Sequence, residues 1–261
     1  MINPLDALAA TGRSVLGVCR YTGEISIFAG NGLSHAVRPP VFWRMLWQSF
    51  VEIAFFSLPV VALTAVFTGM VLALQSYTGF SRFNAESATA AVVVLSITRE
   101  LGPVLAALMV AGRIGASFAA EIGTMRVTDQ IDALTTLSTD PMKYLVAPRL
   151  VAGILAMPLL VAVADVLGVM GGWIIATAKL GFGSSAYLVS TMDSLKTEDV
   201  VSGLVKAAVF GFIVTLMGCW HGYRSKGGAQ GVGQATTSAV VSASIMILAL
   251  DYVLTEMFFA R

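Results

Sequence analysis

Residues 53–81 read IAFFSLPVVALTAVFTGMVLALQSYTGFS, and this stretch contains no Asp, Glu, Lys or Arg. An α-helix needs roughly 20 mainly apolar residues to cross about 30 Å of hydrocarbon. The stretch is long enough to do so. It therefore predicts a membrane-spanning helix that begins at about Phe50.

Four further stretches have the same character, with at most two charged residues each: 87–112, 150–178, 201–222 and 227–250. No repeat with a period of tens of residues is visible. The pattern predicts an all-α integral membrane protein, with five spans packed as one bundle over residues 46–261.

The composition supports a membrane protein and excludes other classes. Of the 261 residues, 57% are hydrophobic and only 12% are charged, against roughly one quarter charged in a soluble domain. A net charge of +1 and the lack of a basic run argue against nucleic-acid binding.

The two cysteines and two histidines do not have the sequence spacing of a metal site. We therefore expect no metal and interpret all four as structural: Cys19, Cys219, His35 and His221. The N-terminus lacks the apolar core and cleavage site of a secretory signal.

The distribution of basic residues predicts the orientation of the bundle. With the N-terminus in the cytoplasm, ten basic residues lie inside, against four outside. The inner ones are Arg13, Arg20, Arg38, Arg44, Arg113, Arg126, Lys143, Arg149, Arg224 and Lys226, and the outer ones are Arg82, Lys179, Lys196 and Arg261. This bias follows the positive-inside rule. Five spans then place the C-terminus on the outside.

Residues 1–45 precede the first span and have an amphipathic pattern. Asp6, Arg13, Arg20 and Glu24 recur on one helical face. The pattern favours an interfacial helix, and a cytoplasmic helix packed on the bundle is the alternative. Interruptions at Gly23, Gly30, Gly32 and Pro39-Pro40 predict that this segment is not one long helix.

A polar segment joins the second and third spans. We expect the second span to end near Gly112 and a short helix to follow, with Thr128 as its cap and an apolar stripe at Ile131 and Leu134. The remaining positions carry charged and polar groups. Such a helix either docks a partner protein or forms a solvated loop.

Five ionisable residues fall inside the predicted spans: Arg99, Glu100, Asp165, Lys206 and Asp251. Each costs about 2.5 to 3.5 kcal/mol near the bilayer centre, so we expect each to have a partner on another span. Similar depths predict a Lys206–Asp251 pair and an Arg99–Asp165 pair. These charges either fix the helix register or contact a transported molecule.

Three motifs resemble the MlaE/YrbE permease family: ELGPVLAALMVAGRIGASFAAEIGTMRVTDQIDAL at 100–134, GMVLALQ at 69–75 and LDYVLT at 250–255. The likeness extends from about residue 45 almost to the C-terminus. It implies the permease of an ATP-binding-cassette (ABC) transporter in the bacterial inner membrane, which moves phospholipids between the inner and outer membranes and maintains the lipid asymmetry of the outer membrane.

The resemblance also implies partners and sites. The partners are a second copy of the chain, two ATPase subunits, a periplasmic hexamer of MCE-domain lipid-binding proteins and, in some complexes, a small cytoplasmic accessory subunit. Residues 121–134 correspond to the coupling helix that docks on the ATPase, with contacts at Glu121, Met125, Arg126, Asp129, Gln130 and Asp132. The lipid lies against the first span, at Leu72, Gln75, Phe80 and Phe83, for which ordinary helix packing is the alternative.

The chain has no GxxxxGK[ST] phosphate loop and no nucleophile paired with a base. We therefore expect no catalytic residues and no cofactor in this chain, with ATP and Mg²⁺ bound by the ATPase subunit. An ion-coupled secondary transporter that uses Glu100, Asp165 or Asp251 is the alternative function, although no inverted repeat supports it. A membrane scaffold without transport would leave the intramembrane charges unexplained.

Overall fold

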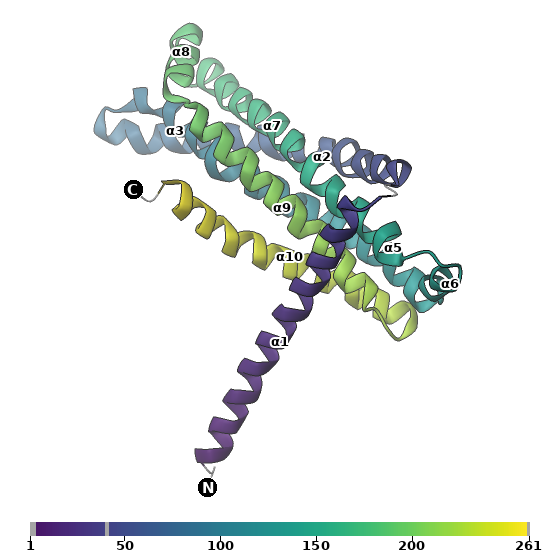
Figure 1. Cartoon of the computed structure of the whole chain (residues 1–261). Helices are drawn as coiled ribbons and strands as arrows, with labels where there is room; N and C mark the ends of the chain where they lie inside the picture. The colour runs from purple at the N-terminus through teal and green to yellow at the C-terminus, as the bar shows by residue number, and fades with distance from the viewer. Residues whose placement is uncertain (1–3, 40–41, 260–261) are drawn as a thin grey trace.

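The computed structural model describes residues 4–39 and 42–259, whose secondary-structure elements are all helical (Figure 1). Five helical segments in this part of the chain are long and apolar enough to cross a membrane: Trp43–Phe83, Glu86–Val127, Met142–Ala178, Thr197–Tyr223 and Gly228–Phe259. This confirms the five predicted spans and an all-α multi-pass membrane protein.

Several spans are built from more than one helical element. The first is α2 (Trp43–Phe80) with a 3₁₀ turn, η1 (Ser81–Phe83). The second runs through η2 (Glu86–Ala88), α3 (Thr89–Ser96), the π-helical turn η3 (Ile97–Leu101), α4 (Gly102–Val110), a second π-helical turn η4 (Ala111–Gly115) and α5 (Ala116–Val127). The third is a π-helical turn, η5 (Met142–Val146), followed by α7 (Ala147–Ala178). The last two are α9 (Thr197–Tyr223) and α10 (Gly228–Phe259).

Two short helices mark opposite ends of the bundle (Figure 1). Helix α6 (Gln130–Thr136) joins the second and third spans, and α8 (Ser184–Ser194) joins the third and fourth. We refer to these as the α6 end and the α8 end.

The sequence predicted that the second span ends near Gly112, and this prediction is wrong. The span continues to Val127, because the π-helical turn η4 takes in Gly112 without breaking the helix. The predicted cap is also wrong. Thr128 ends α5, its hydroxyl donates to the Thr124 carbonyl, and Asp129 precedes α6 in the left-handed conformation with φ of 58°. The apolar stripe is confirmed, since Ile131 is buried and Leu134 packs against the core.

Helix α1 (Pro4–Val37) is one continuous helix, so the predicted interruption by glycines is wrong. A glycine inside a helix costs only about 1 kcal/mol relative to alanine. Gly32 also allows α1 to pack closely against the Leu150 side chain, since a Cβ at Gly32 would lie 2.6 Å from Leu150 Cδ1. The helix ends just before Pro39, where proline disfavours helical geometry in the preceding residue.

Helix α1 lies crosswise to the bundle and extends beyond it toward its N-terminus (Figure 1). Its C-terminal half is attached to the bundle: Phe28 is buried and meets the Trp220 ring edge-on, at 5.2 Å between centroids. The placement of α1 at a membrane interface remains a prediction. Of the residues on its predicted charged face, the side chain of Asp6 lies outside the described ones.

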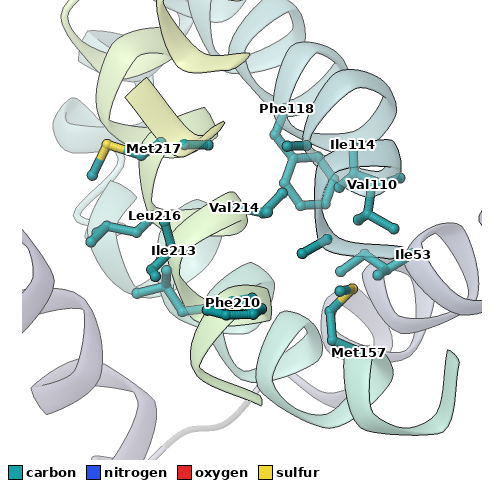
Figure 2. Close-up of a cluster of buried hydrophobic side chains, with 14 of the residues drawn as sticks. Ile53, Val110, Ile114, Phe118, Met157, Phe210, Ile213, Val214, Leu216 and Met217 are labelled. Atoms are coloured by element: carbon teal, nitrogen blue, oxygen red, sulfur yellow. The ribbon is translucent and has the colours of Figure 1, made fainter. Parts of the chain in front are cut away.

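The main core lies between the middle spans and is made of branched, aromatic and methionine side chains (Figure 2). Ile114, Phe118, Met157 and Phe210 are fully buried within it. Helix α9 is the most buried span, whereas α2 and α10 are the least buried. The outer faces of α2 and α10 are therefore left for lipid or for another protein.

Candidate functional site

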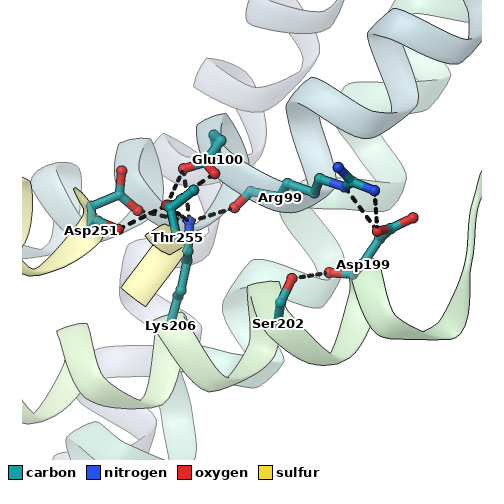
Figure 3. A network of polar contacts seen from close by, with 7 residues as sticks. All are labelled: Arg99, Glu100, Asp199, Ser202, Lys206, Asp251 and Thr255. Atoms are coloured by element: carbon teal, nitrogen blue, oxygen red, sulfur yellow. Dashed lines mark hydrogen bonds and ion pairs between the residues drawn. The ribbon is translucent and has the colours of Figure 1, made fainter. Parts of the chain in front are cut away.

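A polar network crosses the bundle between η3, α9 and α10, in the half nearer the α8 end (Figure 3). It consists of six residues: Arg99, Glu100, Asp199, Lys206, Asp251 and Thr255. All six lie on helical segments that are long and apolar enough to cross a membrane, where an unpaired charge costs about 2.5 to 3.5 kcal/mol. Clustering the charges on three helices lowers that cost.

The backbone of η3 creates one of the acceptors of this network. Pro103 has no N–H, so the Arg99 carbonyl four residues earlier loses the hydrogen bond that an α-helix would give it. The Gly102 N–H bonds instead to the Ile97 carbonyl, which is the five-residue spacing of a π-helical turn. The ammonium of Lys206 donates to the freed Arg99 carbonyl at 3.0 Å.

Lys206 is fully buried and is the centre of the network. Its Nζ also donates to Glu100 Oε2 at 2.7 Å and to Thr255 Oγ1 at 2.7 Å. An ammonium has three donors, and these three hydrogen bonds use all of them. Asp251 Oδ1 lies 3.0 Å from Nζ but has no aligned hydrogen bond, so it acts on Lys206 through charge.

The second half of the network is an arginine–carboxylate pair. Arg99 Nε donates to Asp199 Oδ1 at 2.8 Å, and Arg99 Nη2 lies 2.7 Å from the same oxygen in an ion pair. Asp199 is 1% exposed, and its Oδ2 accepts the Lys196 backbone N–H at the start of α9. The Arg99 guanidinium also lies 4.4 Å from the centroid of the Phe259 ring. Asp199 therefore both caps α9 and fixes Arg99.

The network is open on one side. The side chains of Glu100 and Arg99 are 36% and 33% exposed, whereas Lys206 is 0% exposed. The six residues include two cations and three carboxylates, so the network formally has one more acidic than basic group. Such a site presents both signs of charge to a polar ligand and has a formal excess of acceptor carboxylates.

The structure confirms one predicted ion pair and rejects the other. Lys206 and Asp251 meet, although Glu100 is the closer partner of Lys206. The Arg99–Asp165 pair is wrong, because similar depth does not place two residues on facing sides of their helices. Arg99 faces α9, while Asp165 on α7 lies against Gly102, where a Cβ would be 1.9 Å from Asp165 Oδ1.

The predicted lipid-wall residues lie on the first span, away from the centre of the network. Leu72 packs against the cluster that contains Ile97, at the start of η3. Gln75 and Phe83 are exposed, and Phe80 is half-buried. Their contact with lipid remains a prediction.

The predicted coupling residues are divided between two helices at the α6 end. Glu121, Met125 and Arg126 lie on α5, whereas Gln130 and Asp132 lie on α6. Three of their charges are engaged within the chain: Glu121 pairs with Arg149, and Arg126 pairs with Asp132, each at 2.7 Å. Asp129, Gln130 and Asp132 remain exposed and form a polar surface.

The sequence is similar to that of known membrane permeases. A family model described as permease MlaE matches residues 46–257. A probable ABC transporter permease protein of Rickettsia bellii is 57% identical over 255 residues, covering 98% of each chain. The intermembrane phospholipid transport system permease protein MlaE of Haemophilus influenzae is 33% identical over 256 residues, also covering 98% of each chain. The chloroplastic protein trigalactosyldiacylglycerol 1 of Arabidopsis thaliana is 36% identical over 236 residues, which are 90% of this chain and 67% of that protein.

Proposed function

The chain belongs to the MlaE permease family of ABC transporters, and on that premise we propose that it moves phospholipids between the inner and outer membranes of a bacterium. The observation that carries the proposal is the polar network. A partly open site with both signs of charge, inside an apolar bundle, suits the zwitterionic or anionic headgroup of a lipid whose tails remain in apolar surroundings.

The proposal includes an assembly around this chain. The α6 end lies in the cytoplasm and docks a separate ATPase that binds ATP and Mg²⁺. The α8 end faces the periplasm and meets a hexamer of MCE-domain proteins, so that transport maintains outer-membrane lipid asymmetry. The positive-inside bias supports this orientation, with the N-terminus cytoplasmic and the C-terminus periplasmic.

The chain also acts as a homodimer in this proposal. One protomer of 27.4 kDa with five spans is too small to enclose a two-tailed lipid. The sparsely buried faces of α2 and α10 leave room for a second copy related by a two-fold axis. A crosslink between cysteines placed at Leu72 tests this, and a monomer in the functional complex would contradict it.

The transport proposal is tested by reconstituting the purified complex, with its ATPase, in liposomes that contain labelled phospholipid. We expect transfer to an acceptor membrane only when ATP is hydrolysed. Transport by this chain alone, coupled to an ion gradient and independent of ATP, would instead support the secondary-transporter alternative.

A further inference from the structure

A groove lies at the α6 end, where the end of α1, the start of α2 and the start of the third span meet. Its volume is about 250 Å³. Two basic residues, His35 and Lys143, line it, and none of the six residues of the polar network does. The rest of its lining is mainly apolar and aromatic and includes Phe42, Trp43, Leu46, Val151 and Leu155. The groove is therefore a separate site that combines cationic and apolar walls.

Lys143 gives this groove a positive charge that is not balanced within the chain. Its ammonium donates to the Pro39 carbonyl at 2.6 Å, and it makes no ion pair among the described residues. An ammonium has three donors, so two remain for a ligand. Asp140 does not neutralise Lys143, because its Oδ2 lies 2.9 Å from His35 Nε2 and its Oδ1 accepts the Met142 N–H.

Two arginines lie close to the groove along the chain. Arg38 follows His35 by three residues, and Arg44 directly follows Trp43. Both arginines are exposed, and neither makes an ion pair in the part of the chain that the structure describes. The surroundings of the groove therefore carry an excess of positive charge, which attracts an anionic ligand.

The groove crosses the level at which the third span becomes apolar. Lys143 precedes the apolar stretch 150–178, whereas Leu155 lies inside it. These two residues are twelve positions apart, which is about 18 Å at the rise of an α-helix. Trp43, which is 72% exposed, is of a type enriched at the membrane–water interface. The groove therefore has a cationic end at the depth of lipid headgroups and an apolar end at the depth of acyl chains.

We infer that this groove binds an anionic phospholipid of the adjacent leaflet, with its phosphate on Lys143 and one acyl chain along Val151 and Leu155. An ammonium donates charge-assisted hydrogen bonds to phosphate, and basic pockets between membrane helices bind anionic headgroups. The surrounding cations repel the ammonium group of a zwitterionic headgroup, so a net negative lipid is favoured. This inference goes beyond the proposed function, because the lipid binds here whether or not the chain transports it.

The first experiment measures lipid selectivity with the full chain in phosphatidylcholine nanodiscs. These contain a trace of phosphatidylglycerol that carries a photoreactive diazirine on its acyl chain, and adducts are mapped to residues by mass spectrometry. Replacing part of the matrix with unlabelled phosphatidylglycerol should lower labelling at Val151 and Leu155 on the order of ten-fold more than the same amount of phosphatidylethanolamine. Equal competition by the two lipids would overturn the inference and show ordinary bilayer contact.

The second experiment tests Lys143 as the phosphate ligand. Lys143→Gln removes the charge but retains a donor for the Pro39 carbonyl, so we expect the preference for phosphatidylglycerol to fall on the order of ten-fold. Lys143→Arg retains the charge and should retain the preference. Lys179→Gln removes an exposed charge at the α8 end and is the matched control. An unchanged preference in folded Lys143→Gln would contradict the inference.

The third experiment fills the apolar part of the groove and decides the matter if Lys143→Gln does not fold. In Leu155→Trp, labelling at Val151 should fall on the order of ten-fold, because the indole occupies the space of the acyl chain. Leu248 is similarly exposed on α10 and does not line the groove, so Leu248→Trp should leave this labelling unchanged. If folded Leu155→Trp is labelled at Val151 as strongly as the unmodified protein, no acyl chain occupies the groove.

Discussion

Lys206 shows how a bundle of this size holds a fully buried cation. Its three donors go to a carboxylate, a hydroxyl and a backbone carbonyl freed by Pro103, and a second carboxylate lies 3.0 Å away. These neighbouring groups accept hydrogen bonds from Lys206 or balance its charge. Replacing Lys206 therefore leaves several of them without a partner.

Lys206→Met should destabilise the protein by about 3 kcal/mol, because removing one partner of a buried pair strands the other. Because Glu100 and Asp251 are partly exposed, this loss of stability lies at the lower end of the range for breaking a buried ion pair. The double variant Lys206→Met with Glu100→Gln should regain part of the loss, since one stranded charge is removed as well.

Thermal unfolding in detergent measures both effects on Lys206, and Lys179→Met at an exposed position is the control. If the effects of Lys206→Met and Glu100→Gln simply add, the two side chains are not coupled and the geometry of the network is wrong.

For individual side chains, the sequence revealed the charges but not all of their partners. Arg99, Glu100, Lys206 and Asp251 stand out because they interrupt apolar stretches. Asp199 was missed, because an acidic residue in the first turn of a helix is ordinarily explained by capping. The π-helical turn η3 was also missed, because the spacing of apolar residues along the sequence does not distinguish it from an α-helix. Pro103 within a span was the available signal.

At the element scale, the contact between α7 and α9 depends on two glycines. A Cβ on Gly211 would lie 2.2 Å from the Gly153 carbonyl oxygen, and one on Gly153 would lie 2.6 Å from the Gly211 carbonyl oxygen. The two backbones therefore touch directly, as small residues permit between membrane helices.

Gly211→Ala should destabilise the bundle by about 1 to 3 kcal/mol, because the added methyl group forces the two backbones apart. Gly112→Ala is the matched control, since nothing outside the adjoining backbone of its own helix lies within 4 Å of a Cβ there and alanine favours the helix. Thermal unfolding of the two variants distinguishes them. Equal midpoints would contradict the close contact between α7 and α9.

The attachment of α1 should depend on pH. Hydrogen bonds from Arg224, and then from Arg20, lower the pKa of Glu24 from its ordinary value of 4.5. A carboxylate with a lowered pKa stabilises the folded state above its ordinary pKa, and this contribution is lost as the pH falls through the lowered value. We therefore expect α1 to loosen from α9 only below about pH 4.5.

A spin label on the exposed Cys19 of α1 reports this loosening as increased mobility. Glu24→Gln should make the label more mobile at neutral pH and remove the pH dependence. If acid leaves the mobility of the unmodified protein unchanged, the Glu24–Arg224 contact does not hold α1.

The sequence predicted the spans well and the helix ends poorly. Hydropathy located all five spans, because an apolar stretch of roughly 20 residues with at most two charges is typical of a membrane-spanning helix. The sequence predicted an end near Gly112 and interruptions at the glycines of α1, yet both helices continue through these residues. Helix α8 was not predicted, since its 11 residues are short and of mixed polarity.

At the scale of the whole molecule, the two ends have different tasks in the proposed complex. The α6 end presents the polar surface of Asp129, Gln130 and Asp132 for ATPase docking, and the α8 end lies beside the polar network. ATP-driven motion would have to pass from one end to the other along α5 and α9, which pack against each other.

Reversing Arg126 or Asp132 should weaken ATPase docking, because both belong to the α6 end. Each single reversal also breaks the internal Arg126–Asp132 pair, so the swapped variant Arg126→Asp with Asp132→Arg is decisive. The swap restores the internal pair and should restore thermal stability, yet it should not restore copurification of the ATPase. Full copurification with the swapped variant would place the docking surface elsewhere.

We propose that the polar network handles the phospholipid during ATP-driven transport. The most direct test of this proposal is the initial rate of ATP-dependent phospholipid transfer in liposomes that contain the complete complex, compared between Glu100→Gln and Glu256→Gln. Both remove one carboxylate at the α8 end, but Glu256 is exposed and makes no ion pair among the described residues. We predict that Glu100→Gln lowers the rate on the order of ten-fold, which corresponds to about 1.4 kcal/mol, while Glu256→Gln retains it and both complexes keep their ATPase. Equal rates for the two variants would contradict the claim.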